Sequence, residues 1–158
     1  MQKVSPCLLF DDQAEEAAKF YVSVFKNSKI LQTTYYGEGM PMPAGTVLTV
    51  KFLLDGEEFL ALNGGSHDQF SLAVSFMVMC ETQAEVDDYW RKLTVGGQEV
   101  QCGWLKDKFG LAWQIVPKQF IEMLDSPDKA AVQRGMAAMM MTMKKLDIAE
   151  LQKAYDNA

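Results

Sequence analysis

Few residues in this chain have side chains suited to acid–base or nucleophilic chemistry near neutral pH. His67 is the single histidine, and it stands in the turn-rich segment Gly64-Gly65-Ser66-His67-Asp68. The ordinary pKa of histidine lies near neutrality, so a Ser-His-Asp or Cys-His mechanism would have to include this residue. His67 beside Asp68 could act as a base at the mouth of a cleft. An exposed loop histidine is the simpler interpretation.

The three cysteines are Cys7, Cys80 and Cys102, an odd number with wide spacing and no CxxC pair. This usage is typical of reduced thiols in a cytoplasmic protein. All three fall on predicted strands, where a buried thiol packs as a small hydrophobic group. Cys102 directly precedes Gly103-Trp104, and it could act as a nucleophile if its side chain faced a cavity.

Glycine-rich nucleotide-binding motifs do not occur in the sequence. The P-loop pattern Gly-x₄-Gly-Lys-Ser/Thr is missing. GxGxxG is missing too, and Gly37-Glu38-Gly39 lies in a proline-containing loop that opens no helix. Rossmann-type enzymes need that turn between a first strand and a helix. The residues therefore give no support to phosphate, dinucleotide or S-adenosylmethionine binding of these kinds.

The composition indicates a globular protein with an acidic balance. The chain has 158 residues, of which 49% are hydrophobic, and a formal net charge of −6. This length suits one domain, or two half-size modules that share a core. Nucleic acids and anionic membranes require clustered Lys and Arg, so we expect neither as a partner. No stretch reads as a signal peptide or reaches the ~20 apolar residues of a membrane span, and we expect a cytoplasmic protein.

The first half of the chain predicts the order strand, helix, strand, strand, strand. Asp12 followed by Glu15 is a capping box at the start of the helix. Asp55-Gly56 is the pair that type I′ hairpin turns favour, so it joins two antiparallel strands. The predicted strands are 4–10, 30–36, 46–54 and 57–63.

The second half repeats this pattern. Gln-Ala-Glu occurs at 13–15 and again at 83–85, each time after an apolar strand and at a helix start. Thr82 with Glu85 forms a second capping box. Strands are predicted at 73–80, 99–105 and 111–116, with Asp107-Lys108-Phe109-Gly110 as a turn ordered by the Asp107 side chain. The sequence therefore indicates a duplicated module, with halves at 1–66 and 67–117.

The segment 118–158 has the character of a helical extension. Ser126-Pro127 predicts a helix start, and Asp147 begins a last short helix. The first of these helices places six apolar residues on one face: Val132, Met136, Met139, Met140, Met143 and Leu146. Packing of this face on the sheet or on a second subunit is the simpler interpretation. Because methionine is soft and adaptable, a binding surface is the alternative.

Three stretches resemble a known family: SPCLLFDDQAEEAAKFYVSVF, AVSFMVMCETQAEVDDYWRKLTVGG and CGWLKDKFGLAWQIVP. They are similar to the PhnB-like branch of the vicinal-oxygen-chelate (glyoxalase, bleomycin-resistance and dioxygenase) superfamily. Members of this branch often carry the name 3-demethylubiquinone-9 3-methyltransferase. The resemblance implies an α+β fold in which two βαβββ modules form a cup, with C-terminal helices added. Relatives are commonly homodimers, so we expect a dimer.

Catalytic members of the superfamily hold a divalent metal with one ligand from each of four strands, usually histidine, glutamine and glutamate. The resemblance places these positions at Pro6, Ala61, Ser75 and Gln114. Proline and alanine have no donor side chain, and a serine hydroxyl is a weak ligand. One amide cannot hold Zn²⁺, Fe²⁺ or Ni²⁺. We therefore expect a metal-free protein without a cofactor.

The leading hypothesis is that the cup binds, and could convert, a small apolar or aromatic molecule. The candidate lining combines apolar and polar side chains: Asn63, Ser75, Met77, Cys102, Trp104, Trp113 and Gln114. For Trp113, packing in the core is an equally good interpretation. A metal-dependent lyase or dioxygenase, an interaction module with a filled cup, and a methyltransferase are the alternatives, and the last has no support from the residues. The ligand, the reaction and the pathway stay open.

Overall fold

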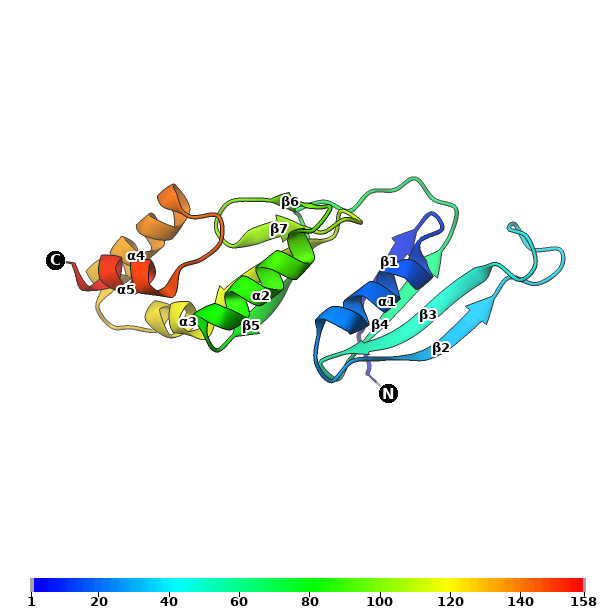
Figure 1. The fold of residues 1–158 in the computed structure, drawn as a ribbon, viewed down its shortest axis with the longest axis horizontal. Coiled ribbons are helices and arrows are strands. Elements are labelled where there is room, and N and C mark those ends of the chain that lie inside the picture. The colour runs from blue at the N-terminus through cyan, green and yellow to red at the C-terminus, as the bar shows by residue number, and fades with distance from the viewer. Residues whose placement is uncertain (1, 158) are drawn as a thin grey trace. The chain divides into compact units, whose positions relative to one another are not determined.

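A computed structural model describes residues 2–157, and in it the chain forms two compact units, Met1–Gln69 and Phe70–Ala158. Each unit contains a four-stranded mixed sheet whose strands and helix follow the order βαβββ. Helices are added after the last strand of the second unit (Figure 1). The predicted α+β class with two such modules is confirmed.

The first unit consists of β1 (Cys7–Phe10), α1 (Ala14–Val24), β2 (Lys29–Tyr35), β3 (Val47–Leu54) and β4 (Glu57–Asn63). Its sheet has the order β1-β4-β3-β2, in which β1 runs parallel to β4 and the other pairs are antiparallel. The hairpin turn between β3 and β4 lies at Asp55 and Gly56, with φ angles of 48° and 81°. Two positive φ angles are what a type I′ turn requires, so the Asp-Gly prediction is confirmed.

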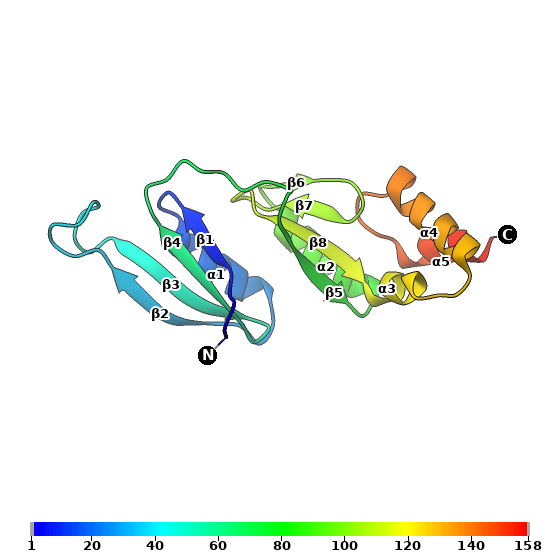
Figure 2. The same cartoon turned by 180° about the vertical axis from the view of Figure 1, so that it is seen from behind.

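One face of the first sheet is buried beneath α1. Strand alternation places Val50, Phe52 and Ala61 on this face, and all three are fully buried. Tyr21 of α1 stacks on Phe52 with ring centroids 6.3 Å apart. Figure 2 shows the opposite face of this sheet, which no helix of the unit covers.

The second unit begins with β5 (Ser75–Cys80), α2 (Gln83–Thr94), β6 (Gln98–Glu99), β7 (Trp104–Lys106) and β8 (Ala112–Pro117). The sheet order is β5-β8-β7-β6, equivalent to that of the first unit. The single strand predicted over 99–105 is wrong. A turn separates β6 from β7, because Cys102 and Gly103 adopt φ angles of 63° and 83°, far outside the β region.

Three helices follow: α3 (Lys118–Leu124), α4 (Lys129–Thr142) and α5 (Ile148–Asp156). They share one apolar cluster with the end of β8, made of Val116, Phe120, Met123, Met139, Met143, Leu146 and Leu151. Helix α4 starts later than Ser126-Pro127 predicted, because Asp128 caps it by accepting from the Ala131 N–H at 3.1 Å. The predicted Asp147 cap is confirmed, since its carboxylate accepts from Glu150 N–H at 3.0 Å.

The two predicted capping boxes have different outcomes. Thr82 caps α2, and its hydroxyl accepts from the Glu85 N–H at 3.2 Å. Asp12 does not cap α1; the cap residue is Gln13, which makes no side-chain cap bond. Asn63, at the end of β4, instead accepts from the Ala14 N–H at 2.8 Å. The sheet therefore supplies the acceptor that a local residue usually provides.

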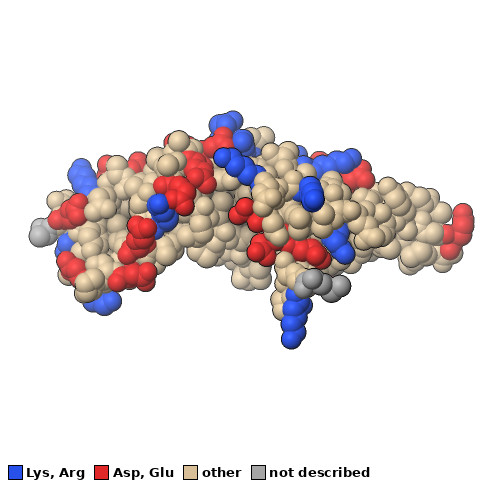
Figure 3. Space-filling model, turned by 90° about the horizontal axis from the view of Figure 1, so that it is seen from below, with Lys and Arg blue, Asp and Glu red and all other residues tan. Residues whose placement is uncertain are grey.

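No helix in the described part of the chain combines the length and hydropathy that a membrane span requires. Lys and Arg side chains are interspersed with Asp and Glu over the face displayed in Figure 3.

Candidate functional site

The face of the second sheet opposite α2 gathers most of the predicted ligand-binding residues. Helix α2 packs against β8 and β7, where Leu105, Trp113 and Ile115 are buried. Alternation turns the other strand residues to the opposite side. We call that side the open face, and Figure 2 shows the sheet from this side. By strand register it consists of Ser75, Met77, Met79, Gln98, Trp104, Lys106, Ala112, Gln114 and Val116. Ala112 and Val116 are buried, and Val116 packs in the apolar cluster of the C-terminal helices.

The strand register brings four of the candidate residues together on the open face. Met77 pairs with Gln114 across β5 and β8, and Gln114 pairs with Trp104 across β8 and β7. Directly paired residues point to the same side of a sheet, so these three side chains form one row. Ser75 joins them, because the Gln114 amide donates from Nε2 to the Ser75 Oγ at 2.8 Å.

The Gln114–Ser75 pair leaves hydrogen-bonding capacity for a ligand. Gln114 uses its Nε2, and no other bond from its side chain is formed within residues 2–157. Its Oε1 can therefore accept a hydrogen bond, and the Ser75 hydroxyl can donate one. Around this neutral pair lie Met77, which is 52% exposed, and the partly exposed Trp104. An apolar surface with a few placed polar groups is the usual composition of a small-molecule site.

Trp113 does not belong to this group. It is 3% exposed, lies on the face covered by α2, and packs against Phe76 with ring centroids 5.6 Å apart. Its indole N–H donates to Asp107 Oδ2 at 2.9 Å. The other oxygen of Asp107 accepts from the N–H groups of Phe109 and Leu111. Asp107 thus orders its turn as predicted, and Trp113 is a core residue.

Asn63 and Cys102 also lie apart from the open-face group. Asn63 is 2% exposed in the first unit, and its Oδ1 and Nδ2 bond to Ala14 and Val47. The Cys102 N–H donates to the Met143 carbonyl at 3.0 Å, and its side chain packs against the apolar cluster of the C-terminal helices. Strand prediction put Cys102 on a sheet face, whereas the turn directs it to the helical extension.

His67 is exposed in the segment between β4 and β5, without a hydrogen bond or ion pair to any described residue. The neighbouring Asp68 carboxylate accepts from the Ser66 hydroxyl at 2.6 Å instead of contacting the histidine. No base or nucleophile is therefore assembled around His67 by the residues beside it.

The four positions assigned to metal ligands contain poor donors. Shifting these positions by one residue along the strands does not supply better ones. Ala61 is fully buried beneath α1, and its neighbours on the uncovered face of the first sheet are Leu60 and Leu62. Cys7 pairs with Leu60 on that face, but desolvation raises the pKa of its thiol and so favours the neutral form, a poor metal ligand. Within each unit, no three His, Cys, Asp or Glu side chains among residues 2–157 are grouped to hold a metal ion.

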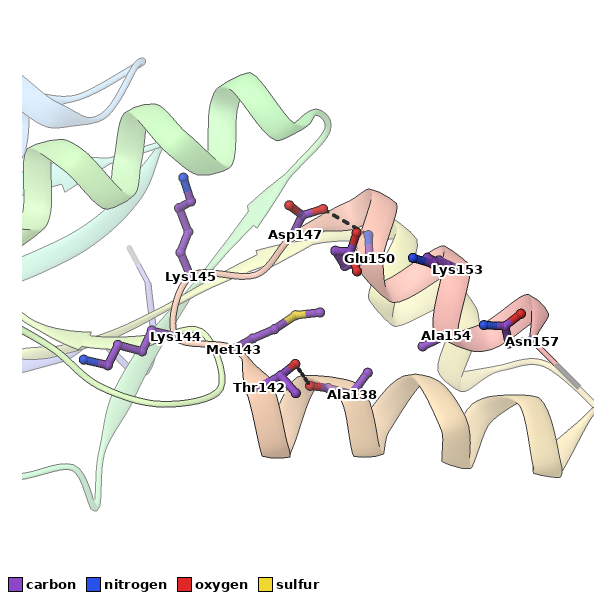
Figure 4. A pocket seen from close by; sticks show the side chains of 10 residues that line it. All are labelled: Ala138, Thr142, Met143, Lys144, Lys145, Asp147, Glu150, Lys153, Ala154 and Asn157. Atoms are coloured by element: carbon purple, nitrogen blue, oxygen red, sulfur yellow. Dashed lines mark hydrogen bonds between the residues drawn. The ribbon is translucent and has the colours of Figure 1, made fainter.

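A separate pocket of about 470 Å³ lies in the helical extension, between α4, α5 and the segment that joins them (Figure 4). Several of its polar groups already have partners. Lys145 reaches toward α2 and pairs with Asp87 at 2.8 Å, and Asp147 caps α5. No local sequence pattern predicts this pocket, because it depends on how two helices pack.

The family model described as 3-demethylubiquinone-9 3-methyltransferase matches residues 2–116. This chain belongs to that PhnB-like family. A PhnB protein from Bacillus cereus has 35% sequence identity and a TM-score of 0.67, and the match covers 73% of this chain and 99% of that one. The family match ends before α3, so the helical extension of this PhnB-like chain lies outside it.

Two more distant solved structures share the fold of this PhnB-like chain. A Pseudomonas aeruginosa protein is 17% identical with a TM-score of 0.62, covering 74% of this chain and 98% of its own. The fosfomycin resistance protein FosX from Listeria monocytogenes is 13% identical with a TM-score of 0.50, covering 74% and 93%. These likenesses show the glyoxalase, or vicinal-oxygen-chelate, fold alone. No curated protein matches the chain.

Proposed function

We propose that this PhnB-like protein binds a small molecule with an apolar or aromatic body on the open face of its second sheet. The observation that carries the proposal is the Gln114–Ser75 hydrogen bond, set beside Met77 and Trp104. The pair offers one acceptor and one donor, and the thioether and indole offer apolar contact.

Binding without a metal ion is the second part of the proposal. It rests on the chemistry of the residues at the ligand positions. Ser75 and Gln114 bond to each other, and the first sheet offers leucines and one thiol with a raised pKa. Catalytic divalent metals in proteins are held by several imidazole, carboxylate or thiolate donors, which these positions do not supply.

Methyl transfer, which the family name describes, is not part of the proposal. The connection between β1 and α1 is Asp11-Asp12-Gln13 and contains no glycine. The next three strands form antiparallel pairs, whereas the Rossmann arrangement alternates parallel strands with helices. The residues thus give no basis for an S-adenosylmethionine site of that type.

A fragment screen by thermal shift, followed by calorimetry on the hits, tests the proposed site. We expect fragments with a hydrogen-bonding group to bind the Gln114→Leu variant about tenfold more weakly than the natural protein, since that variant removes the acceptor at similar volume. Ser75→Ala gives an independent second variant. Gln133→Leu, on an exposed position of α4, is the matched control. Equal affinity in all four proteins would contradict the proposed site.

We further propose that the protein is a cytoplasmic homodimer. The three cysteines are free, which suits a reducing compartment. Met140 and Met141 of α4 are exposed and offer apolar surface to a second subunit. Sedimentation equilibrium should give twice the chain mass, and a monomer at micromolar concentration would contradict the dimer.

A further inference from the structure

A lysine on the open face lies beside the Gln114–Ser75 pair, Met77 and Trp104. Lys106 lies two positions after Trp104 on β7, so both side chains point to the same side of the sheet. Lys106 pairs with Ala112, and Ala112 pairs with Ser75, which places the lysine and the serine in one row across three strands. Gln98 of β6 pairs with Lys106 on its other side.

The charge of Lys106 is not matched by the protein. Its side chain is half-buried, and within residues 2–157 it forms no ion pair or side-chain hydrogen bond. Some other lysines of the same unit do pair with carboxylates: Lys92 with Asp88 and Lys145 with Asp87, each at 2.8 Å. An ammonium group without a counter-charge is stabilised when an anion binds beside it.

The open face carries this charge alone. Its other strand residues are all neutral: Ser75, Met77, Met79, Gln98, Trp104, Ala112, Gln114 and Val116. The chain as a whole has a formal charge of −6, so a face with a net positive charge runs against the overall balance. Such a local field favours an anionic ligand over a neutral one.

We propose that the ligand of the open face is a planar aromatic acid whose carboxylate binds Lys106 and Ser75. The carboxylate would accept from the Lys106 ammonium and from the Ser75 hydroxyl, which Gln114 holds in place by its 2.8 Å bond. The aromatic ring lies against Trp104 and Met77. This inference rests on the proposed small-molecule site and names the chemical class that the site selects.

The test compares acids with their neutral isosteres. Benzoate, 2-naphthoate and indole-3-carboxylate are each titrated beside the matching carboxamide, and affinity is followed through the Trp104 indole N–H signal in ¹H–¹⁵N NMR spectra. We expect the acid to bind about tenfold more tightly than its amide at low salt, and this preference to shrink at high salt. Lys106→Gln should abolish the preference while amide binding stays unchanged, and Lys106→Arg should retain it.

Lys144→Gln is the matched control, because it removes the same charge from an exposed lysine at the pocket of the helical extension. It should leave the preference intact. Equal binding of acid and amide by the natural protein would overturn the aromatic-acid proposal and leave the proposed site standing. A preference that survives Lys106→Gln, or is lost in Lys144→Gln, would overturn it as well. Failure of every acid and amide to bind would overturn both proposals.

Discussion

Asn63 illustrates, at the residue scale, how one buried amide ties a helix to a sheet. Its Oδ1 accepts from the Ala14 N–H, its Nδ2 donates to the Val47 carbonyl at 3.1 Å, and its own carbonyl accepts from the Tyr36 hydroxyl. A buried polar side chain is tolerated only when its hydrogen bonds are satisfied. Asn63 is thus a structural residue of the first unit.

We predict that Asn63→Ala lowers the free energy of unfolding by about 2 kcal/mol, because the buried Ala14 N–H and the partly buried Val47 carbonyl lose their Asn63 partner. Urea unfolding followed by circular dichroism measures the change. Asp12→Ala is the control, since Asp12 is exposed and does not cap α1. Equal losses in the two variants would show that Asn63 does not cap the helix.

The thiols should differ in reactivity, because the thiolate is the reactive form. Burial, and to a lesser extent the Glu85 carboxylate, raises the pKa of Cys80 to about 12. Desolvation also raises the pKa of the Cys7 thiol, but Cys7 is exposed and a reagent can reach it, whereas Cys80 is buried. At pH 8 we predict that iodoacetamide labels Cys7 first and Cys80 only when the protein unfolds, as read by mass spectrometry. Rapid labelling of Cys80 in the folded protein would contradict its burial.

The raised pKa of the Cys80 thiol also makes the stability of the fold depend on pH in the alkaline range. The folded-state pKa of Cys80 lies above the ordinary thiol value of 9.0, so the folded state favours the neutral thiol. Its contribution to stability is therefore complete below pH 9 and declines as the pH rises toward 12. Melting temperatures should fall across this window by less in Cys80→Ala than in the natural protein.

Strand alternation in the sequence was enough to place some candidate residues on one face of a sheet, while their role in ligand binding stays a prediction. Ser75, Met77, Trp104 and Gln114 lie on regular strands, and the structure brings them together. The sequence alone could not exclude Asn63 from the predicted ligand-binding residues. Its hydrogen-bond partners, Ala14 and Val47, are 49 and 16 residues away in the sequence. Long-range hydrogen bonds of this kind leave no local pattern.

At the scale of elements, Gln83 attaches the helical extension to the second module. Its amide nitrogen donates to the Leu146 carbonyl at 3.0 Å, and its amide oxygen accepts from the Ile148 N–H at 2.8 Å. The equivalent residue of the first repeat, Gln13, is exposed and makes no cap bond. The two glutamines share a sequence position and have different structural roles.

This difference gives a matched pair of variants. We predict that Gln83→Ala increases hydrogen exchange in the α4–α5 connection and lowers stability by about 1–3 kcal/mol, because two backbone groups lose their partners. Gln13→Ala should change neither quantity. Mass-spectrometric hydrogen exchange resolves the segment, and unchanged exchange at residues 146–148 in Gln83→Ala would refute the attachment.

Element boundaries followed from the sequence where caps and turns are local, as at Thr82, Asp147 and Asp55-Gly56. They did not where packing decides. Helix α3 begins directly after Pro117 and buries Phe120 and Met123 against the later helices. No sequence pattern within 118–124 predicts this contact. Likewise, the turn at Cys102 is fixed by its bond to Met143, 41 residues later.

At the scale of the whole molecule, the protein repeats one topology. The sheet orders β1-β4-β3-β2 and β5-β8-β7-β6 are equivalent, as the duplicated Gln-Ala-Glu suggested. The repeats have diverged on their uncovered faces. The first presents Cys7, Leu60 and Leu62 beside Lys51 and a hydrogen-bonded Thr34–Thr49 pair, and the second presents the Gln114–Ser75 pair beside Met77 and Trp104. The duplication in the sequence predicted the fold. The strand pairing in the structure was needed to place the proposed site on the sheet of the second repeat.

Metal content is a property of the whole protein, and it tests the metal-free proposal. We predict that untagged protein treated with EDTA contains less than about one-tenth equivalent of Zn, Fe, Ni or Mn by elemental analysis, because the ligand positions supply too few donors. Re-addition of each metal should leave the melting temperature unchanged. One retained equivalent, or a metal-dependent rise in melting temperature, would contradict it.

The most direct measurement is a ¹H–¹⁵N NMR titration of metal-free protein with small aromatic fragments, observed at every backbone and side-chain N–H. We predict shifts that concentrate at Ser75, Met77, the Trp104 indole and the Gln114 amide, with the pocket at Thr142 and Lys153 undisturbed. Shifts confined to that pocket, or binding that appears only after a divalent metal is added, would contradict a metal-free small-molecule site on the open face.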